Sequence, residues 1–465
     1  MMNTAKLETV LKRLPGFERL TACERLSAGA SRETYRLSVV LDGAARTLAL
    51  RRAPGDGQSA MGAGPGLNIE AKLFSAAKSA GVPGPDVLLV LQPEDGLGAG
   101  FAMDWISGET LGGKIVRSPE LEGARRSLAR QCGQILARLH SVDVQAAGLG
   151  DALDSFTPDH IVRKTHAAYL ELNSPQPMID FTALWLLKNL PPHRPLTLVH
   201  GDFRNGNLIV EPNEGVVAVL DWELAHVGDP MRDLGWLMTR SWRFGANAKA
   251  VGGFGEPEDL FAGYQSVSGH KVDRKAVHFW EVFGSFWWAV GTLSMAQSFR
   301  NGSEPSVERP AIGRRSSECQ IDCVNMLIPG WARRPQAAVS SAGDLPTKDE
   351  LLTGVRDFLR SEAESGQKGR SQFLSRVSAN AVDIVLREMS LGPDADAWEV
   401  QGLSAILNAS GGLAELRAKL CAAMRAGDID LKRPDLHACL RDSVFARVMI
   451  DQPGYAGALE CAAAT

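Results

Sequence analysis

Three polar residues near the middle of the chain have the types and the spacing needed to handle a magnesium-bound triphosphate. Asn207 follows Asp202 by five residues, and Asp221 comes fourteen residues later between two apolar neighbours. Mg²⁺ takes oxygen ligands in near-octahedral geometry and usually few of them from protein. A carboxylate beside the attacking hydroxyl, followed by an amide and a second carboxylate for the metal, is the arrangement used in phosphoryl transfer. We therefore predict Asp202 as the catalytic residue, Asn207 and Asp221 as Mg²⁺ ligands, and ATP as the donor.

Asp202 is not expected to act as a strong general base. An ordinary aspartate has a pKa near about 4, so it is a weak proton acceptor at neutral pH. Phosphoryl transfer depends mainly on in-line positioning and on charge neutralisation. We therefore expect Asp202 to align the acceptor hydroxyl and to accept its proton late in the reaction.

A β-hairpin is predicted to carry the two candidate metal ligands. Residues 208–210 and 216–220 are apolar runs of strand length, and residues 212–215 between them read Pro-Asn-Glu-Gly, which is a turn sequence. The two ends of a hairpin are adjacent, so Asn207 and Asp221 are expected to lie side by side.

Two longer motifs contain these residues. Residues 200–207 read His-Gly-Asp-Phe-Arg-Asn-Gly-Asn, and residues 220–235 read Leu-Asp-Trp-Glu-Leu-Ala-His-Val-Gly-Asp-Pro-Met-Arg-Asp-Leu-Gly. Together they closely resemble the aminoglycoside phosphotransferase and choline kinase-like family of small-molecule kinases, over about residues 15–330. A chance His-Gly-Asp turn between two strands explains the first motif alone but not the pair.

The resemblance implies an α+β, protein kinase-like bilobal fold. The smaller lobe, an antiparallel sheet plus a helix that covers the nucleotide, is expected over residues 1–106. The larger and mainly helical lobe, with the catalytic and acceptor-binding residues, is expected over residues 107–332. Residues 333–345 are small and polar as in a linker, and residues 346–465 follow as a helical domain in which we find no catalytic constellation.

Two segments of the smaller lobe are predicted to contact the nucleotide. A small-residue turn at residues 26–32 lies between two strand-like segments and resembles the Gly-x-Ser loop of the family. Its backbone N–H groups can approach phosphate oxygens because Gly29 and Ser31 add little bulk. The resemblance assigns backbone contact with adenine to three residues between the lobes: Asp104, Trp105 and Ile106.

A basic residue in the predicted third strand is a further candidate for nucleotide binding. Arg51, within residues 47–52, stands where kinases place a Lys that contacts the phosphates, and Glu70, in a predicted helix over residues 68–80, is its expected partner. An Arg is not equivalent to a Lys, because its planar fork prefers two-point contacts. The alternative is that Arg51 and Arg52, which face opposite sides of a strand, are both solvated.

Two residues of the motifs are predicted to support the site. His200 is expected to pack beneath the catalytic loop and to hydrogen-bond to backbone, with a catalytic role as the alternative. Asp233 lies at the head of a predicted helix, where a carboxylate can cap the helix and also hold the catalytic loop.

Composition limits the remaining classes of protein. The 465 residues are too many for one core, and 45% hydrophobic with 22% charged residues is typical of a soluble globular protein. A net charge of −4 provides no electrostatic footprint for nucleic acid, and no apolar run reaches the roughly 18 residues that span a membrane. The seven cysteines are scattered without a CxxC pair, which favours reduced thiols and a cytoplasmic location.

The acceptor is predicted to be a small molecule with a hydroxyl group. Residues 278–288 are rich in aromatic side chains and carry little charge, which favours an apolar or acyl acceptor, although a buried helix would also explain them. The resemblance favours the branch of the family associated with acyl-CoA dehydrogenases, and thus a hydroxyacyl-CoA or another apolar hydroxyl compound.

Two alternative functions stay open at this point. One is an antibiotic kinase that acts on aminoglycosides or macrolides, which the absence of an acidic cluster disfavours. The other is a nucleotide-binding pseudokinase scaffold, which the complete set of Asp202, Asn207 and Asp221 disfavours and Arg51 favours. A protein partner, or self-association, through residues 346–465 is a further prediction.

Overall fold

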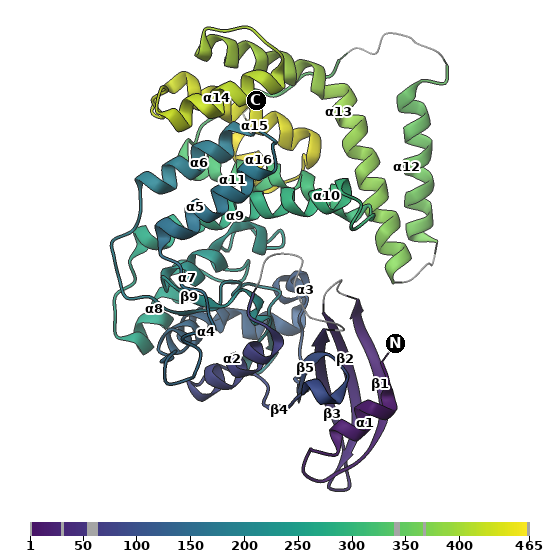
Figure 1. The fold of residues 1–465 in the computed structure, drawn as a ribbon. Helices are drawn as coiled ribbons and strands as arrows, with labels where there is room; N and C mark the ends of the chain where they lie inside the picture. The colour runs from purple at the N-terminus through teal and green to yellow at the C-terminus, as the bar shows by residue number, and fades with distance from the viewer. Residues whose placement is uncertain (1, 29–31, 54–63, 339–344, 366–368, 463–465) are drawn as a thin grey trace. The chain divides into compact units, whose positions relative to one another are not determined.

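The computed structural model describes the chain in five stretches and divides it into two compact units (Figure 1). The described residues are 2–28, 32–53, 64–338, 345–365 and 369–462. The first unit comprises Met1–Pro158 and Pro191–Glu281, and the second comprises Asp159–Leu190 and Val282–Thr465. Each unit is therefore assembled from two segments that are distant in the sequence.

An antiparallel sheet forms the N-terminal part of the first unit. Its strands lie in the order β1, β2, β3, β5, β4, and their bounds are β1 Phe17–Ala28, β2 Glu33–Leu41, β3 Ala44–Ala53, β4 Val87–Val90 and β5 Ala99–Asp104. Alternation along the strands places Leu37, Leu48 and Leu50 in one core with helix α1 (Thr4–Leu11). The turn from β2 to β3 has positive φ at Asp42 (47°) and Gly43 (74°), as tight two-residue hairpins require.

The register of this sheet separates the two arginines of β3. Arg52 lies opposite Glu33 of β2, and its Nε donates to Glu33 Oε2 at 2.9 Å. Arg51 instead reaches helix α2 (Leu67–Ser79), where Glu70 is fully buried. The side chains of Arg51 and Arg52 are 16% and 10% exposed, so the alternative with two solvated arginines is wrong.

The rest of the first unit positions the predicted catalytic loop. Its elements are η1 Pro93–Asp95, α3 Gly112–Arg117, η2 Pro119–Leu121, α4 Glu122–His140, β6 Thr197–Val199, β7 Leu208–Glu211, β8 Gly215–Val219, η3 Trp222–Leu224, β9 His226–Gly228, α7 Met231–Met238, η4 Arg240–Trp242 and α8 Pro257–Ser268. Strands β7 and β8 pair antiparallel, with Leu208 opposite Val219, which confirms the predicted hairpin. Helices α4 and α8 pack closely, since a Cβ at Gly133 would lie 2.1 Å from Leu260 O.

The second unit is built from helices around one apolar core. Their bounds are α5 Pro158–Glu171, α6 Pro177–Lys188, α9 Arg274–Arg300, α10 Glu308–Arg314, α11 Ser316–Leu327, α12 Lys348–Glu364, α13 Arg370–Leu407, α14 Leu413–Ala426, α15 Pro434–Asp451 and α16 Ala456–Cys461. The boundary between the units falls within α9, whose residues 274–281 belong to the first unit. Helix α12 begins with a capping box formed by Thr347 and Glu350. Across the parts of the chain that the structure describes, no helix is both long enough and apolar enough to cross a bilayer.

The compact units divide the chain differently from the predicted lobe boundary at residue 332. Residues 159–190 and 282–332, which the sequence reading placed in the larger lobe, group with the C-terminal helices. The physical reason is a shared core, because Phe181 of α6 and Ile321 of α11 pack in the same cluster as Leu440 of α15. Helices α6 and α11 therefore find their apolar partners far along the chain.

Candidate active site

The loop after β6 is held from beneath by a buried histidine. His200 is 0% exposed, and its Nδ1 accepts the backbone N–H of Asp202 at 3.2 Å. The ring proton must then lie on Nε2, which donates to Leu220 O at 3.1 Å. Burial lowers the pKa of His200, although nearby Asp233 opposes that effect. The neutral ring thus contacts backbone on both sides, as predicted for a supporting residue.

A second buried residue fixes the start of the same loop. The Asp233 carboxylate accepts the backbone N–H groups of His200 (2.8 Å) and Gly201 (2.9 Å), and His140 Nε2 donates to it at 3.2 Å. Burial works against ionisation of Asp233, but the His140 and His200 interactions outweigh it and lower its pKa to about 2. Asp233 is therefore an anion that ties the loop to α7 and α4.

The predicted capping role belongs to a different residue. Asp233 forms no cap hydrogen bond at the start of α7, whereas Asp229 Oδ1 accepts the backbone N–H of Met231 at 2.9 Å. The physical reason is position, because Asp233 lies in the first turn of α7, after the N-terminal N–H groups that a cap must reach. Asp233 still places negative charge in that first turn, which suits the helix dipole.

Gly201 explains why this loop differs from the His-Arg-Asp loop of protein kinases. Its φ of +77° lies in the left-handed region, and a Cβ there would lie 2.3 Å from Leu224 O. A larger residue at position 201 would therefore displace the backbone around Leu224. The close approach keeps the loop against the segment that follows Asp221.

Asp202 is surrounded by hydrogen-bond donors. Its Oδ1 accepts Trp236 Nε1 at 2.8 Å and Arg204 Nε at 3.0 Å, and its Oδ2 accepts Asn207 Nδ2 at 2.6 Å. The Arg204 guanidinium also lies 4.3 Å from the centre of the Trp242 ring. Burial raises the pKa of Asp202, and the charge of Arg204 opposes that rise. The carboxylate is thus fixed in orientation and is a better proton acceptor than a free aspartate.

The two candidate metal ligands meet at the open end of the β7–β8 hairpin. Asn207 O accepts the backbone N–H of Leu220 at 2.8 Å, which places Asn207 beside the residue before Asp221. Asn207 Nδ2 donates to Asp202 O and Oδ2, so its Oδ1 is the atom left to act as a ligand. Asp221 has a φ of +68°, a left-handed conformation that costs energy for a residue other than glycine and is frequent at functional sites.

These two side chains fit a magnesium ion that is carried with a nucleotide. Asp221 offers a carboxylate whose side chain is 31% exposed, and Asn207 offers a neutral amide oxygen. Carboxylate and amide oxygens are ligands that hard divalent cations prefer. Mg²⁺ keeps several positions for water and phosphate, so two protein ligands suffice for a nucleotide-bound ion.

Arg51 connects the sheet to the metal-binding candidates. Its Nη2 donates to Asp221 Oδ1 at 2.6 Å, and its Nε lies 3.3 Å from Glu70 Oε1. Burial opposes ionisation of Asp221, but Arg51 outweighs it and lowers the pKa of that carboxyl. For Glu70 the balance is reversed, because its complete burial raises the pKa in spite of Arg51. The structure therefore brings together three residues that are far apart in the sequence.

Sequence reasoning missed other residues of this cluster. Arg32 Nη1 lies 2.9 Å from Glu70 Oε2 and 3.3 Å from Glu223 Oε2, so a second guanidinium group shares the site. Trp236, which binds Asp202, was also missed. The available signals were weak: Arg32 is the last residue of the small-residue turn, and Glu223 stands two residues after Asp221.

The remaining predicted nucleotide contacts have less geometric support. Gly29 and Ser31 lie outside the described residues. The backbone N–H of Asp104 donates to Asp86 O (3.0 Å) and that of Trp105 to Thr47 O (3.4 Å), so the sheet already uses both groups. Ile106 follows directly and is half-buried.

Comparison with known proteins defines the class to which this fold and site belong. The family profile described as "Phosphotransferase enzyme family" matches residues 22–270, and the chain belongs to this family. It thus contains a domain of a phosphotransferase enzyme family whose members use ATP with a divalent metal. The profile of a domain of unknown function, DUF6285, matches residues 365–455.

Two curated proteins each contain a segment that is similar to this chain. Mouse acyl-CoA dehydrogenase family member 10 is 33% identical over 243 residues, which are 50% of this chain and 21% of that protein. Human acyl-CoA dehydrogenase family member 11 is 31% identical over 174 residues, or 36% of this chain and 22% of that protein. The chain therefore spans about a fifth of the length of these relatives.

A solved structure has the same fold. It is a Ralstonia eutropha JMP134 protein, solved as a candidate aminoglycoside phosphotransferase, with 24% identity and a TM-score of 0.56. The similarity covers 69% of this chain and 96% of that one. With the family match it confirms the predicted α+β, protein kinase-like fold.

Proposed function

We propose that this phosphotransferase moves the γ-phosphate of ATP, bound with Mg²⁺, to a hydroxyl of an apolar or acyl small molecule, with hydroxyacyl-CoA as the first acceptor class. One observation carries the proposal. Asp202 and Asn207 are joined by a 2.6 Å hydrogen bond, and Asn207 is joined through Leu220 to Asp221, so proton-accepting and metal-binding groups form one connected site.

Asp202 receives the acceptor hydroxyl in this mechanism. Trp236 donates to Oδ1, Asn207 donates to Oδ2, and Arg204 Nε lies 3.0 Å from Oδ1 and 3.2 Å from Oδ2. We assign Oδ2 as the oxygen that accepts the hydroxyl, because its nearest donor is the neutral amide of Asn207. The raised pKa of this buried carboxyl favours transfer of the hydroxyl proton to Oδ2 as the hydroxyl oxygen bonds to the γ-phosphorus and the bond from that phosphorus to the departing ADP oxygen breaks. The contribution of Asp202 is alignment first and proton acceptance second.

Asn207 Oδ1 and Asp221 would hold the metal ion. Bound Mg²⁺ supplies charge neutralisation at the phosphate oxygens. Arg51 fixes Asp221 through the 2.6 Å contact to Oδ1, so Oδ2 is the oxygen available to the ion. The guanidinium of Arg51 also brings positive charge to the place where the phosphates bind, while Glu70 holds it in position.

The nucleotide is proposed to lie between the sheet and the metal site. The backbone of Ile106, rather than the N–H groups of Asp104 and Trp105, is the candidate adenine contact because those two groups are bonded within the sheet. Gly29 and Ser31 remain candidates for covering the phosphates. These assignments rest on position relative to β3 and β5 and on the family resemblance.

The acceptor class follows from the relatives and from the character of the aromatic segment. The curated relatives carry the name acyl-CoA dehydrogenase family member, and this chain is similar to about a fifth of each of them. The acid of the aromatic segment, Glu281, lies 3.2 Å from Arg243, and burial raises its pKa to about 7 against the opposing charge of that arginine. Because Arg243 balances its charge, Glu281 attracts a polycationic acceptor such as an aminoglycoside only weakly.

The test is transfer of radiolabel from γ-labelled ATP, with and without Mg²⁺, to a panel of hydroxyacyl-CoAs, free hydroxy acids, aminoglycosides and macrolides. We expect labelling of a hydroxyacyl-CoA that depends on Mg²⁺ and disappears in Asp221→Asn. Labelling of an antibiotic alone would replace the acyl acceptor with an antibiotic kinase. Tight ATP binding without labelling of any acceptor would favour the pseudokinase scaffold.

A further inference from the structure

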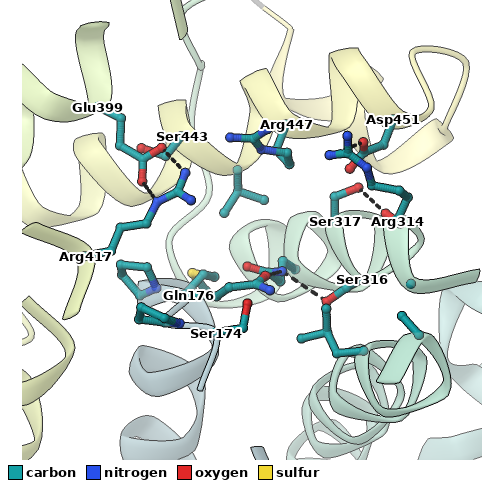
Figure 2. A pocket seen from close by; sticks show the side chains of 18 of the residues that line it. Ser174, Gln176, Arg314, Ser316, Ser317, Glu399, Arg417, Ser443, Arg447 and Asp451 are labelled. Carbon is teal, nitrogen blue, oxygen red and sulfur yellow. Dashed lines mark hydrogen bonds and ion pairs between the residues drawn. The ribbon is translucent and has the colours of Figure 1, made fainter. Parts of the chain in front are cut away.

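The second unit contains a cavity that the phosphotransferase motifs do not use. Its volume is about 410 Å³, within the range of small-molecule binding sites. Helices α6, α9, α10, α11, α13, α14 and α15 and residues 174–176 before α6 contribute the lining residues, all of which belong to the second unit. Figure 2 shows polar side chains pointing into this space from several helices.

Arginines outnumber acids in the wall of this cavity. The lining includes four arginines and two acids: Arg300, Arg314, Arg417, Arg447, Glu399 and Asp451. Two of these arginines are matched, because Arg417 forms a two-point pair with Glu399 and Arg314 Nη1 lies 3.3 Å from Asp451 Oδ1 (Figure 2). Both acids are buried, so these pairs neutralise charge inside the wall.

The other two arginines leave positive charge at the cavity. Arg447 contacts Glu388 (3.1 Å) and Asp396 (3.4 Å), which lie outside the lining and have 40% and 50% exposed side chains. Water screens those acids more than it screens a charge that faces the cavity. Arg300 at the end of α9 forms no ion pair with any residue that the structure describes, and its Nη1 donates to Gln297 Oε1 at 3.4 Å.

The rest of the wall is apolar. Met178 of α6, Leu403 of α13, and Leu440 and Val444 of α15 are buried residues that line the cavity. Phe299, the neighbour of Arg300, also lines it and is 45% exposed. An arginine and an aromatic ring at the same edge, with an apolar interior, suit a ligand that has a charged end and an apolar body.

We propose that this cavity binds a small organic anion with an apolar body, whose carboxylate or phosphate is held by Arg447 and Arg300. Guanidinium groups match both kinds of oxyanion through two-point hydrogen bonds. The apolar body packs on Met178, Leu403 and Val444. This second site is independent of the proposed phosphotransferase reaction, and it gives the helical region a ligand-binding function.

Titration calorimetry on the full chain tests the proposal with three probes of equal chain length: octanoate, octyl phosphate and octanol. We expect at least one anion to bind about 10- to 100-fold more tightly than octanol, the worth of charge-assisted hydrogen bonds. Binding of octanoate alone identifies a carboxylic acid ligand, and binding of octyl phosphate alone identifies a phosphate monoester. Binding of octanol as tight as that of both anions, or binding of no probe at millimolar concentration, would overturn the proposal.

Variants locate the site. Arg300→Gln and Arg447→Gln are each expected to weaken anion binding about 10-fold. The matched control is Arg433→Gln, at the start of the same helix as Arg447, because Arg433 pairs with Asp435 and does not line the cavity. Ser443→Phe fills the cavity without removing a charge and is expected to abolish binding.

A variant can lose affinity either because it loses a ligand contact or because the unit becomes less stable, and these two effects are measured separately. Arg447 also links α15 to α13, so its loss can loosen the unit, whereas Arg300 has no ion pair among the described residues. Each variant is therefore also melted with and without the anion, since a ligand of the folded state raises the melting temperature. Wild-type affinity in both Arg300→Gln and Ser443→Phe, with wild-type melting, would exclude this cavity as the site.

Discussion

The candidate active site of the first unit and the cavity of the second unit both bury charged groups, but with opposite character. In the active site the carboxylates of Asp202, Asp221 and Asp233 face donors that hold them as anions or tune their pKa. In the cavity, arginines outnumber acids and two of the acids serve as counter-charges for them. The first arrangement suits a cation and a phosphate, and the second suits an organic anion.

The two regions also differ in how the chain assembles them. Asp202, Asn207, Asp221 and Asp233 come from one stretch joined by a hairpin and a short helix. The cavity takes its arginines from α9, α10, α14 and α15, whose positions depend on packing of the whole helical core. Local assembly leaves a motif in the sequence, whereas assembly by packing leaves none.

Asp202→Asn is expected to have the largest effect, and it tests whether the active site depends on the Asp202 carboxylate. The substitution keeps the shape of the side chain but removes the oxygen charge that accepts the hydroxyl proton. Turnover is expected to fall by about 10²- to 10⁴-fold while ATP affinity is retained. Initial rates of ADP formation and equilibrium ATP binding, measured on the same preparation, provide the check.

Glu214→Gln is the matched control for that experiment, because Glu214 is an exposed residue in the turn of the β7–β8 hairpin. It removes one negative charge near the same segment without touching Asp202. A fall in turnover that is equal in both variants would mean that Asp202 has no specific role.

Asp233→Asn tests whether a buried anion holds the catalytic loop. Removing one partner from a buried charged network costs about 3 kcal/mol, so a fall of this size in the free energy of unfolding is expected. The folded pKa of about 2 lies below the unfolded value of about 3.9, so the carboxylate stabilises the protein above about pH 4. That contribution is lost as the pH falls through about 2.

Urea unfolding of the wild type and of Asp233→Asn at several pH values checks both statements. The difference in unfolding free energy should be full at pH 7 and should shrink as the solution approaches pH 2. A difference that does not change with pH would show that the charge of Asp233 is unimportant to the loop.

The sequence predicted the parts of the active site that lie within the two motifs, and the family resemblance added the pairing of Arg51 with Glu70. The β7–β8 hairpin, the buried His200 and the pairing of Arg51 with Glu70 all agree with the structure. Trp236 and Arg32 were missed because their contacts to Asp202 and Glu70 arise only when α7 and the sheet are packed. Hydrogen bonds of that kind have no spacing rule in the sequence.

The second unit was harder to predict for the same reason. Its helical character over residues 346–465 was predicted from the sequence. The boundaries of this unit were not predicted. Helices α6 and α11 share a core with α14 and α15, and amino-acid composition does not reveal such a shared core. The arginines of the cavity, at positions as distant as 300 and 447, meet only through that core.

Glu399→Gln measures the cost of a buried charge in the second unit. The variant leaves Arg417 without its two-point partner, but Arg417 has a 23% exposed side chain and can be partly solvated. The expected loss of unfolding free energy is therefore about 2 kcal/mol, less than for Asp233→Asn. A double-mutant cycle with Arg417→Gln isolates the pair, and a coupling near zero would contradict its role as an internal neutralised pair.

The smallest expected effect concerns the one position where the active site departs from the usual kinase residue. Arg51 contacts Glu70 and Asp221 at the same time, and the single ammonium of a Lys reaches two carboxylates less well. Arg51→Lys is expected to lower kcat/KM for ATP about 10-fold, or about 1.4 kcal/mol of transition-state stabilisation. Arg46→Lys, on the exposed part of the same strand, is the matched control. An Arg51→Lys enzyme as active as wild type would mean that positive charge alone is needed beside Asp221, and the two-point contact would then be a feature of packing between sheet and helix.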